Sequence, residues 1–85
     1  MEETLKEKDY FKSSDICLST ALYCYGYKID AIDNQSPNKS TFLIHRDDGI
    51  DDIIQSYFNH KLRIDPITFF NALKEIKTRI HNSRN

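Results

Sequence analysis

Hydrophobic residues recur at helical spacing in the first third of the chain. After Ser13 and Ser14, whose hydroxyls are typical helix caps, apolar residues follow at intervals of three, four and seven until Gly26. Because glycine commonly ends a helix, this pattern predicts a helix over residues 14–25. The preceding residues 9–12 include two adjacent aromatic residues, and we expect them to form a short edge strand.

The hydrophobic period changes to two in the middle of the chain. Apolar and polar residues alternate over residues 27–31 and again over residues 41–45, which predicts two strands of a β-hairpin. Residues 33–39 between them are rich in turn-forming residues. We therefore expect a long loop there, which is either an irregular connection or a contact surface.

Two more helices are predicted in the C-terminal half. Residues 50–58 carry a single apolar stripe and follow a break at residues 47–49. Farther along the chain, Asp65 has the character of an N-cap and Pro66 suits the first helical position. Apolar residues at intervals of four, three and four over residues 69–80 then predict the last helix.

These elements together predict one small α+β domain over residues 9–82, with a flexible start at 1–8 and a frayed end at 83–85. A two- or three-stranded antiparallel sheet, built from the hairpin and the short first strand, is expected to be covered by three helices in the order β-α-β-β-α-α. The expected core consists of Ile16, Leu18, Leu22, Ile29, Phe42, Ile44, Ile54, Phe58, Phe70, Leu73 and Ile76.

The length and composition narrow the class of protein. A chain of 85 residues with 39% apolar residues leaves little room for an enclosed catalytic cleft beside its core. Its apolar runs are far shorter than the roughly 18 residues that a membrane span needs. The acidic, polar residues 1–8 are unlike a signal peptide. We therefore expect a cytoplasmic protein with no membrane contact.

The formal net charge of −1 conceals a gradient along the chain. Residues 13–60 carry three Lys and Arg against seven Asp, whereas residues 61–85 carry six Lys and Arg against two acids. Either the basic end offsets the acidic middle within the fold, or it meets an acidic partner or a nucleic acid. These alternatives stay open at the level of sequence.

The basic residues of the last predicted helix are the candidate contact residues. They recur at intervals of three, four and three, which places them on one helical stripe. This stripe consists of Lys74, Lys77, His81 and Arg84. It is either a solvated face, a contact for a protein partner, or a contact for a phosphate backbone.

No pattern of catalytic, cofactor or metal chemistry is found. The acidic residues 47–52 lack the ligand spacing of a calcium loop, and the three histidines fall in three different elements without zinc-site spacing. Two glycines cannot form a phosphate cradle. Cys17 and Cys24 fall on the apolar face of the first predicted helix, where we expect buried, unreactive thiols. We therefore predict no catalytic, cofactor-binding or metal-binding residue, and no enzyme.

Two segments carry a resemblance to a known family. They are Tyr10-x-x-Ser13-Ser14-Asp15 near the start and Asp65-Pro66-x-x-Phe69-Phe70-Asn71-Ala72-Leu73-Lys74 near the end. Over residues 10–80 the chain resembles a family of small bacterial and phage proteins known only as a domain of unknown function. The resemblance implies a cytoplasmic, non-enzymatic domain that mobile elements often carry, and it supplies no catalytic residues.

The leading functional hypothesis is a small non-catalytic module that binds or regulates a protein by occupying its surface. It rests on the absence of a chemical motif together with the separated charges and the many aromatic residues. The alternative is an accessory protein that binds nucleic acid through the basic last helix. A homodimer is a further open alternative, because a short chain with ten aromatic residues could enlarge its core by pairing.

Overall fold

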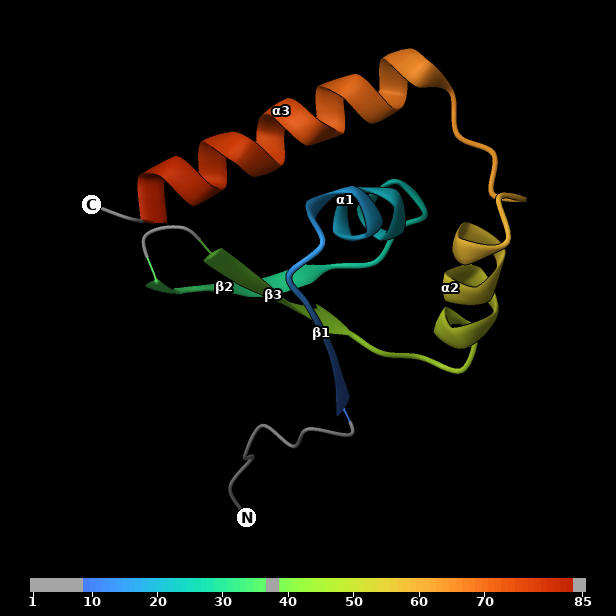
Figure 1. The fold of residues 1–85 in the computed structure, drawn as a ribbon, viewed down its shortest axis with the longest axis horizontal. Coiled ribbons are helices and arrows are strands. Elements are labelled where there is room, and N and C mark those ends of the chain that lie inside the picture. The colour runs from blue at the N-terminus through green and yellow to red at the C-terminus, as the bar shows by residue number, and fades with distance from the viewer. Residues whose placement is uncertain (1–8, 37–38, 84–85) are drawn as a thin grey trace.

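The computed structural model describes residues 9–36 and 39–83. Its elements follow the predicted order β-α-β-β-α-α, and they pack as an α+β fold, so the predicted class is confirmed (Figure 1). The elements are β1 (Tyr10–Ser13), α1 (Ile16–Cys24), β2 (Ile29–Ser36), β3 (Lys39–His45), α2 (Ile50–Phe58) and α3 (Pro66–Ser83).

The sheet has three antiparallel strands in the order β1-β3-β2. The predicted short N-terminal strand is confirmed, since Phe11 pairs with Ile44 and Ser13 pairs with Phe42. On the other side of β3, Ile29 pairs with the same Ile44. Alternate residues point to opposite faces of a strand, so Phe42 and Ile44 share the face that is buried.

The predicted loop over residues 33–39 is wrong for most of its length. Asp33 pairs with Thr41 and Ser36 pairs with Lys39, so both strands continue into this segment; residues 37–38 lie outside the described residues. The register shifts between Ile29 and Ala31 and again before Ser36, which marks bulges in an edge strand. Pairing with β3 overrides the low strand propensity of these polar residues, because strand propensity depends strongly on context.

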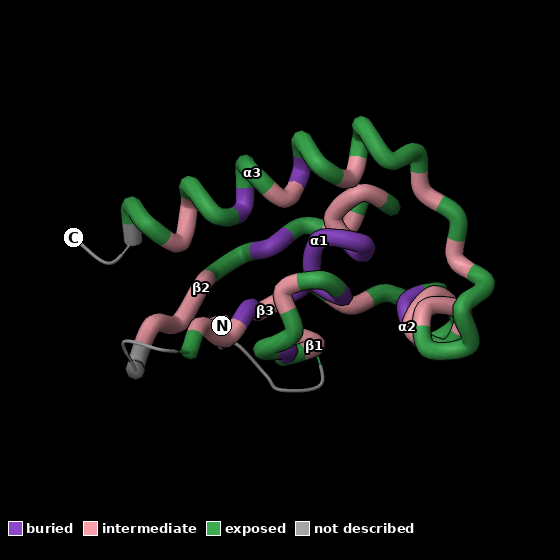
Figure 2. Tube along the Cα trace, turned by 45° about the horizontal axis from the view of Figure 1, so that its top comes forward, coloured by how far each residue is buried: buried purple, intermediate pink, exposed green. Residues whose placement is uncertain are grey.

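Helices α1 and α3 lie over one face of the sheet. Helix α1 lies between the sheet and α3, and α2 flanks it at one side (Figures 1 and 2). Each of these elements except β1 supplies at least one residue to the buried cluster. That cluster consists of Leu18, Leu22, Ile29, Phe42, Ile44, Ile50 and Ile76.

Six of the predicted core residues are fully buried, but two predictions are wrong. The exposed fractions of Phe58 and Phe70 are 60% and 58%. Each follows another aromatic residue that takes the inward position, Tyr57 or Phe69, and a step of about 100° per residue turns the second ring outward. Ile16, Ile54 and Leu73 are half-buried, whereas Ile50, which the predicted core omits, is fully buried.

The N-terminal caps differ between the first and last helices. The Asp15 carboxylate caps α1 by accepting hydrogen bonds from the Cys17 and Leu18 amides, at 3.0 and 3.2 Å. Ser13 instead ends β1, so the predicted serine caps are wrong and α1 begins at Ile16. The predicted cap of α3 is confirmed, because the Thr68 amide donates to the Asp65 carboxylate at 2.9 Å. No helix in the described part of the chain is long and apolar enough to cross a membrane.

The C-terminal stop of α1 depends on Gly26, as predicted. The Gly26 amide donates to the Tyr23 carbonyl and the Tyr27 amide to the Leu22 carbonyl, both at 3.0 Å, which is the Schellman arrangement. Gly26 has a φ of 96°, a conformation that costs little only for glycine.

The two glycines are expected to respond in opposite ways to alanine. Gly26→Ala should lower the free energy of unfolding by about 1 kcal/mol because its φ is positive. Gly49→Ala should leave it unchanged or raise it by up to about 1 kcal/mol, because φ is −94° and an added Cβ meets its nearest atom, the Tyr27 hydroxyl oxygen, at 3.5 Å. Urea unfolding of both variants checks this pair, and equal losses would contradict it.

Candidate partner-binding site

An apolar groove lies where the end of α2 meets the start of α3. Its volume is about 650 Å³. Apart from the Tyr57 hydroxyl and the His60 ring, its lining side chains are hydrocarbon. They are Ala21, Tyr57, His60, Leu62, Ile64, Pro66, Phe69, Phe70 and Leu73.

The segment between α2 and α3 forms the floor of this apolar groove. Leu62 and Ile64 line it, while the alternate residues Lys61 and Arg63 are exposed. The Tyr25 hydroxyl, from the end of α1, donates to the Arg63 carbonyl at 2.9 Å and holds the segment against α1. The apolar side chains of this segment therefore face the groove, and its cations face solvent.

His60 sets the angle at which the chain leaves α2. It has a φ of 63°, in the left-handed region where residues other than glycine are uncommon. The His60 amide donates to the Tyr57 carbonyl at 3.1 Å and the Lys61 amide to the Ser56 carbonyl at 2.9 Å, so α2 ends in the same motif as α1. Because this position holds a histidine and not a glycine, it supplies a side chain, the His60 ring, to the lining of the apolar groove.

Three large hydrophobic residues stand exposed beside the apolar groove. Phe70 lines the groove, and Ile67, which is 70% exposed, follows the lining residue Pro66. The Phe58 ring packs edge-on against the ring of Tyr57, another lining residue, with 5.1 Å between the ring centres. Figure 2 shows exposed residues along the side of α3 that faces away from α1. Single exposed hydrophobic residues are ordinary, but a cluster beside an apolar groove is typical of an interaction surface.

The structure brings the predicted basic residues onto the same side of α3 as Phe70. Lys74, Lys77 and His81 are all exposed, and Arg84 lies outside the described residues. At about 100° per residue, Lys77 falls between Leu73 and Phe70 around the helix axis, so it continues the line of the apolar groove. We call Lys74, Lys77 and His81 the basic stripe.

The basic stripe is not neutralised within the described part of the chain. Neither Lys74 nor Lys77 forms an ion pair there. In the acidic middle, Arg46 pairs with Asp51, and the His45 imidazole lies 3.9 Å from the Asp30 carboxylate. The Lys74 ammonium instead lies 5.3 Å from the centre of the Phe70 ring, in a cation–π contact. Among the described residues, Lys74 and Lys77 therefore form no ion pair with the acidic residues of the middle of the chain.

The other charged residues of α3 have structural contacts. Arg79, half-buried, donates from its guanidinium to the Ile29 carbonyl at 3.1 Å, on the edge strand β2. Glu75 accepts a hydrogen bond from the Tyr23 hydroxyl at 3.0 Å. The Asp65 carboxylate caps the helix, and the hydrogen bonds from Thr68 lower its pKa. Glu75 contacts Tyr23 of α1 and Asp65 precedes the helix, so the charged residues on the outer side of α3 are those of the basic stripe.

The two thiols differ in burial, and the apolar groove contains neither of them. Cys17 is exposed, so the prediction that both thiols are buried is wrong; Cys24 is half-buried, and burial raises its pKa. A raised pKa opposes the thiolate that nucleophilic catalysis needs. No carboxylate or thiol lines the apolar groove. Among the described residues, no three His, Cys, Asp or Glu residues are placed to hold a metal ion.

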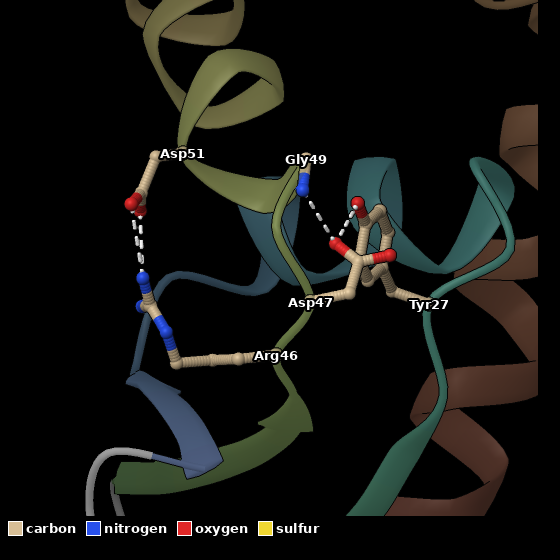
Figure 3. Close-up of polar contacts among 5 residues, drawn as sticks. All are labelled: Tyr27, Arg46, Asp47, Gly49 and Asp51. Atoms are coloured by element: carbon tan, nitrogen blue, oxygen red, sulfur yellow. Dashed lines mark hydrogen bonds and ion pairs between the residues drawn. The ribbon is translucent and has the colours of Figure 1, made fainter.

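A second, more polar hollow, whose lining includes Tyr27, Asp47 and Ile53, lies beside the start of α2. Its side chains are mostly engaged with one another: the Tyr27 hydroxyl donates to Asp47 at 2.7 Å, and the Gly49 amide donates to the same carboxylate at 2.9 Å (Figure 3). The hydrogen bond raises the pKa of Tyr27 to about 12 and lowers the pKa of Asp47. Close by, Arg46 pairs with both oxygens of Asp51, at 2.9 and 3.0 Å. These contacts hold the turn between β3 and α2.

The hydrogen bond between Tyr27 and Asp47 is expected to make stability depend on pH at the alkaline end. The folded pKa of Tyr27, about 12, lies above its unfolded value near 10, so the contribution is complete below pH 10 and is lost as pH rises through 12. Tyr27→Phe should cost about 1 kcal/mol at pH 7 and less above pH 10. Urea unfolding of both proteins from pH 7 to 11.5 measures this difference, and a constant difference would contradict it.

The apolar groove is the part of the site that the sequence patterns missed. The available signals were two pairs of adjacent aromatic residues, Tyr57-Phe58 and Phe69-Phe70, in which both rings cannot face one core. The alternation of Leu62 and Ile64 with charged residues was a further signal in the segment between the helices.

Comparison with known proteins gives a family and no described relative. Neither the curated proteins nor the solved structures contain a significant match to the chain. The sequence profile of the domain of unknown function DUF5659 matches residues 8–82, which include every described helix and strand except the last residue of α3. The chain therefore belongs to the DUF5659 family.

Proposed function

We propose that this protein is a small, non-catalytic module of the cytoplasm that binds another protein through the apolar groove and the basic stripe. The observation that carries the proposal is the position of Phe70. It is 58% exposed, it lines the apolar groove, and it contacts the first cation of the basic stripe. One side chain thus joins the two surfaces into a single contact area. The module is expected to act by occupying its partner's surface, and its carriage by phages or other mobile elements is part of the proposal.

The composition of the apolar groove favours a protein over a nucleic acid. Aliphatic side chains such as Leu62, Ile64 and Leu73 suit the apolar side chains of a protein segment. Surfaces that bind single-stranded nucleic acid rely instead on aromatic rings that stack on bases along a positively charged groove. Nucleic acid is the second candidate, because Phe70 and Lys74 together provide one ring and one cation.

Affinity capture from the native cell, with matched variants of the full chain, tests the proposal. We expect wild type and Lys28→Glu to retain the same partner, whereas the double variant Lys74→Glu, Lys77→Glu should retain at most about one tenth as much. Lys28 is a suitable control because it is exposed, lies between α1 and β2, and does not line the apolar groove. Equal capture by all three proteins would argue against the basic stripe.

A mobility-shift titration separates the two candidates. Phosphate contacts are strongest at low salt, so a nucleic-acid function requires a complex at about 50 mM salt that weakens steeply toward 200 mM. We expect no complex with single- or double-stranded oligonucleotides that depends on Lys74 and Lys77. A salt-sensitive complex that the double variant loses would favour the nucleic-acid candidate.

A further inference from the structure

We infer that the partner segment is an acidic amphipathic helix, about four turns long, that lies along α3. This inference rests on the proposed function, because it names the chemistry of the partner at the same surface. The surface has two parts in sequence along one helix. An apolar half contains Ile67 and Phe70, and a basic half contains Lys74, Lys77 and His81.

The length of the segment follows from the spacing of these residues. Ile67 and His81 are fourteen residues apart, which corresponds to about 21 Å along a helix axis. A partner helix of about 14 to 16 residues covers the same distance. Its apolar side chains, three and four residues apart, would enter the apolar groove beside Phe70 and Leu73.

The charge of the segment follows from the cations around the apolar groove. Lys61 and Arg63 are exposed on one side, and Lys74 and Lys77 are exposed on the other. No carboxylate lines the apolar groove, and that of Asp65 accepts the Thr68 hydrogen bonds that cap α3. A partner with Asp and Glu beside its apolar stripe meets opposite charge along its length, whereas a basic partner is repelled.

A selection from random peptides tests the inference directly on the chemistry of the bound segment. The full chain is immobilised, and a phage library of random peptides of about 16 residues is selected for binding. We expect the enriched peptides to carry net negative charge and apolar residues at intervals of three and four. Enriched peptides that are neutral or basic, or no enrichment over a blank surface, would overturn the inference.

Matched variants then show where the selected peptides bind. Synthetic copies, measured by fluorescence anisotropy, should bind the double variant Ile67→Ala, Phe70→Ala at least tenfold more weakly than wild type. The double variant Lys74→Glu, Lys77→Glu should weaken binding by a similar factor, and Lys28→Glu should not change it. Raising the salt from about 50 to 500 mM should weaken the wild-type complex severalfold, because exposed charges are screened.

The outcomes separate the inference from the proposed function. Basic peptides that still depend on Phe70 would overturn the inference and leave the proposed site standing. Acidic peptides that bind the Ile67→Ala, Phe70→Ala variant as tightly as wild type would overturn the site itself. If sedimentation shows a dimer that this variant converts to monomer, a second copy occupies the surface and the acidic-helix inference is wrong.

Discussion

Truncating Phe42 to alanine is expected to lower the free energy of unfolding by about 3 to 5 kcal/mol. Phe42 lies on the central strand β3, is 1% exposed, and belongs to the cluster that joins the sheet to all three helices. A domain of this size has a total stability of about 4 to 13 kcal/mol, so the variant should lose between about a quarter and all of it. Urea unfolding followed by circular dichroism measures the loss.

Leu43 provides the matched control for Phe42. It is the next residue on β3, points to the opposite face of the sheet, and is only half-buried. Leu43→Ala should therefore cost clearly less than Phe42→Ala. Equal losses for the two variants would contradict the assignment of the helix-covered face as the core.

Removing the exposed apolar side chains of α3 should cause a large loss of binding with little loss of stability, unlike Phe42→Ala. We expect Ile67→Ala, Phe70→Ala to weaken binding to the captured partner by about a hundredfold or more, since buried apolar anchors dominate such interfaces. Both residues are mostly exposed in the free protein, and alanine is the better helix former. The free energy of unfolding should therefore change by less than about 1 kcal/mol, part of it from the lost contact with Lys74.

Asn82→Ala is the control on the same helix, because Asn82 is exposed and lies far from the apolar groove along α3. Isothermal titration calorimetry with the purified partner should give the wild-type affinity for this variant. If Ile67→Ala, Phe70→Ala also binds with wild-type affinity while folding normally, the apolar groove is not the binding site.

Local signals predicted the start of α3 and the end of α1 well, because these two helix ends carry their own capping residues. Asp65 and Pro66 begin α3, and Gly26 ends α1 at the position that a left-handed residue requires. The end of α2 carries no such signal, since His60 occupies the position where glycine is usual.

The strands were harder to predict because their stability comes from pairing across the sheet. Residues 33–36 have little intrinsic strand preference, and they are extended because β3 supplies hydrogen-bond partners over its whole length. Similarly, the sequence predicted Ser13 and Ser14 as caps, whereas Ser13 ends β1 and Asp15 takes the capping position.

The sequence predicted one part of the candidate site, the basic stripe, but not the apolar groove. The spacing of Lys74, Lys77 and His81 defines a stripe on any helix, and the structure confirms that it is exposed. The apolar groove requires α2, α3 and the segment between them to be brought together, which no local pattern specifies. Hydrophobicity alone assigned Phe58 and Phe70 to the core, and only the helix orientations show that both rings face outward.

Site-specific photocrosslinking in the native cell tests most directly whether the apolar groove binds a protein. The photoreactive residue p-benzoylphenylalanine replaces Phe70 in one full-length protein and Ala31, exposed on β2, in another. We predict a crosslinked protein adduct from position 70, with the attachment site mapped to an acidic, apolar segment of the partner, and no adduct with the same protein from position 31. An adduct of that partner from position 31 and none from position 70 would contradict the proposed site.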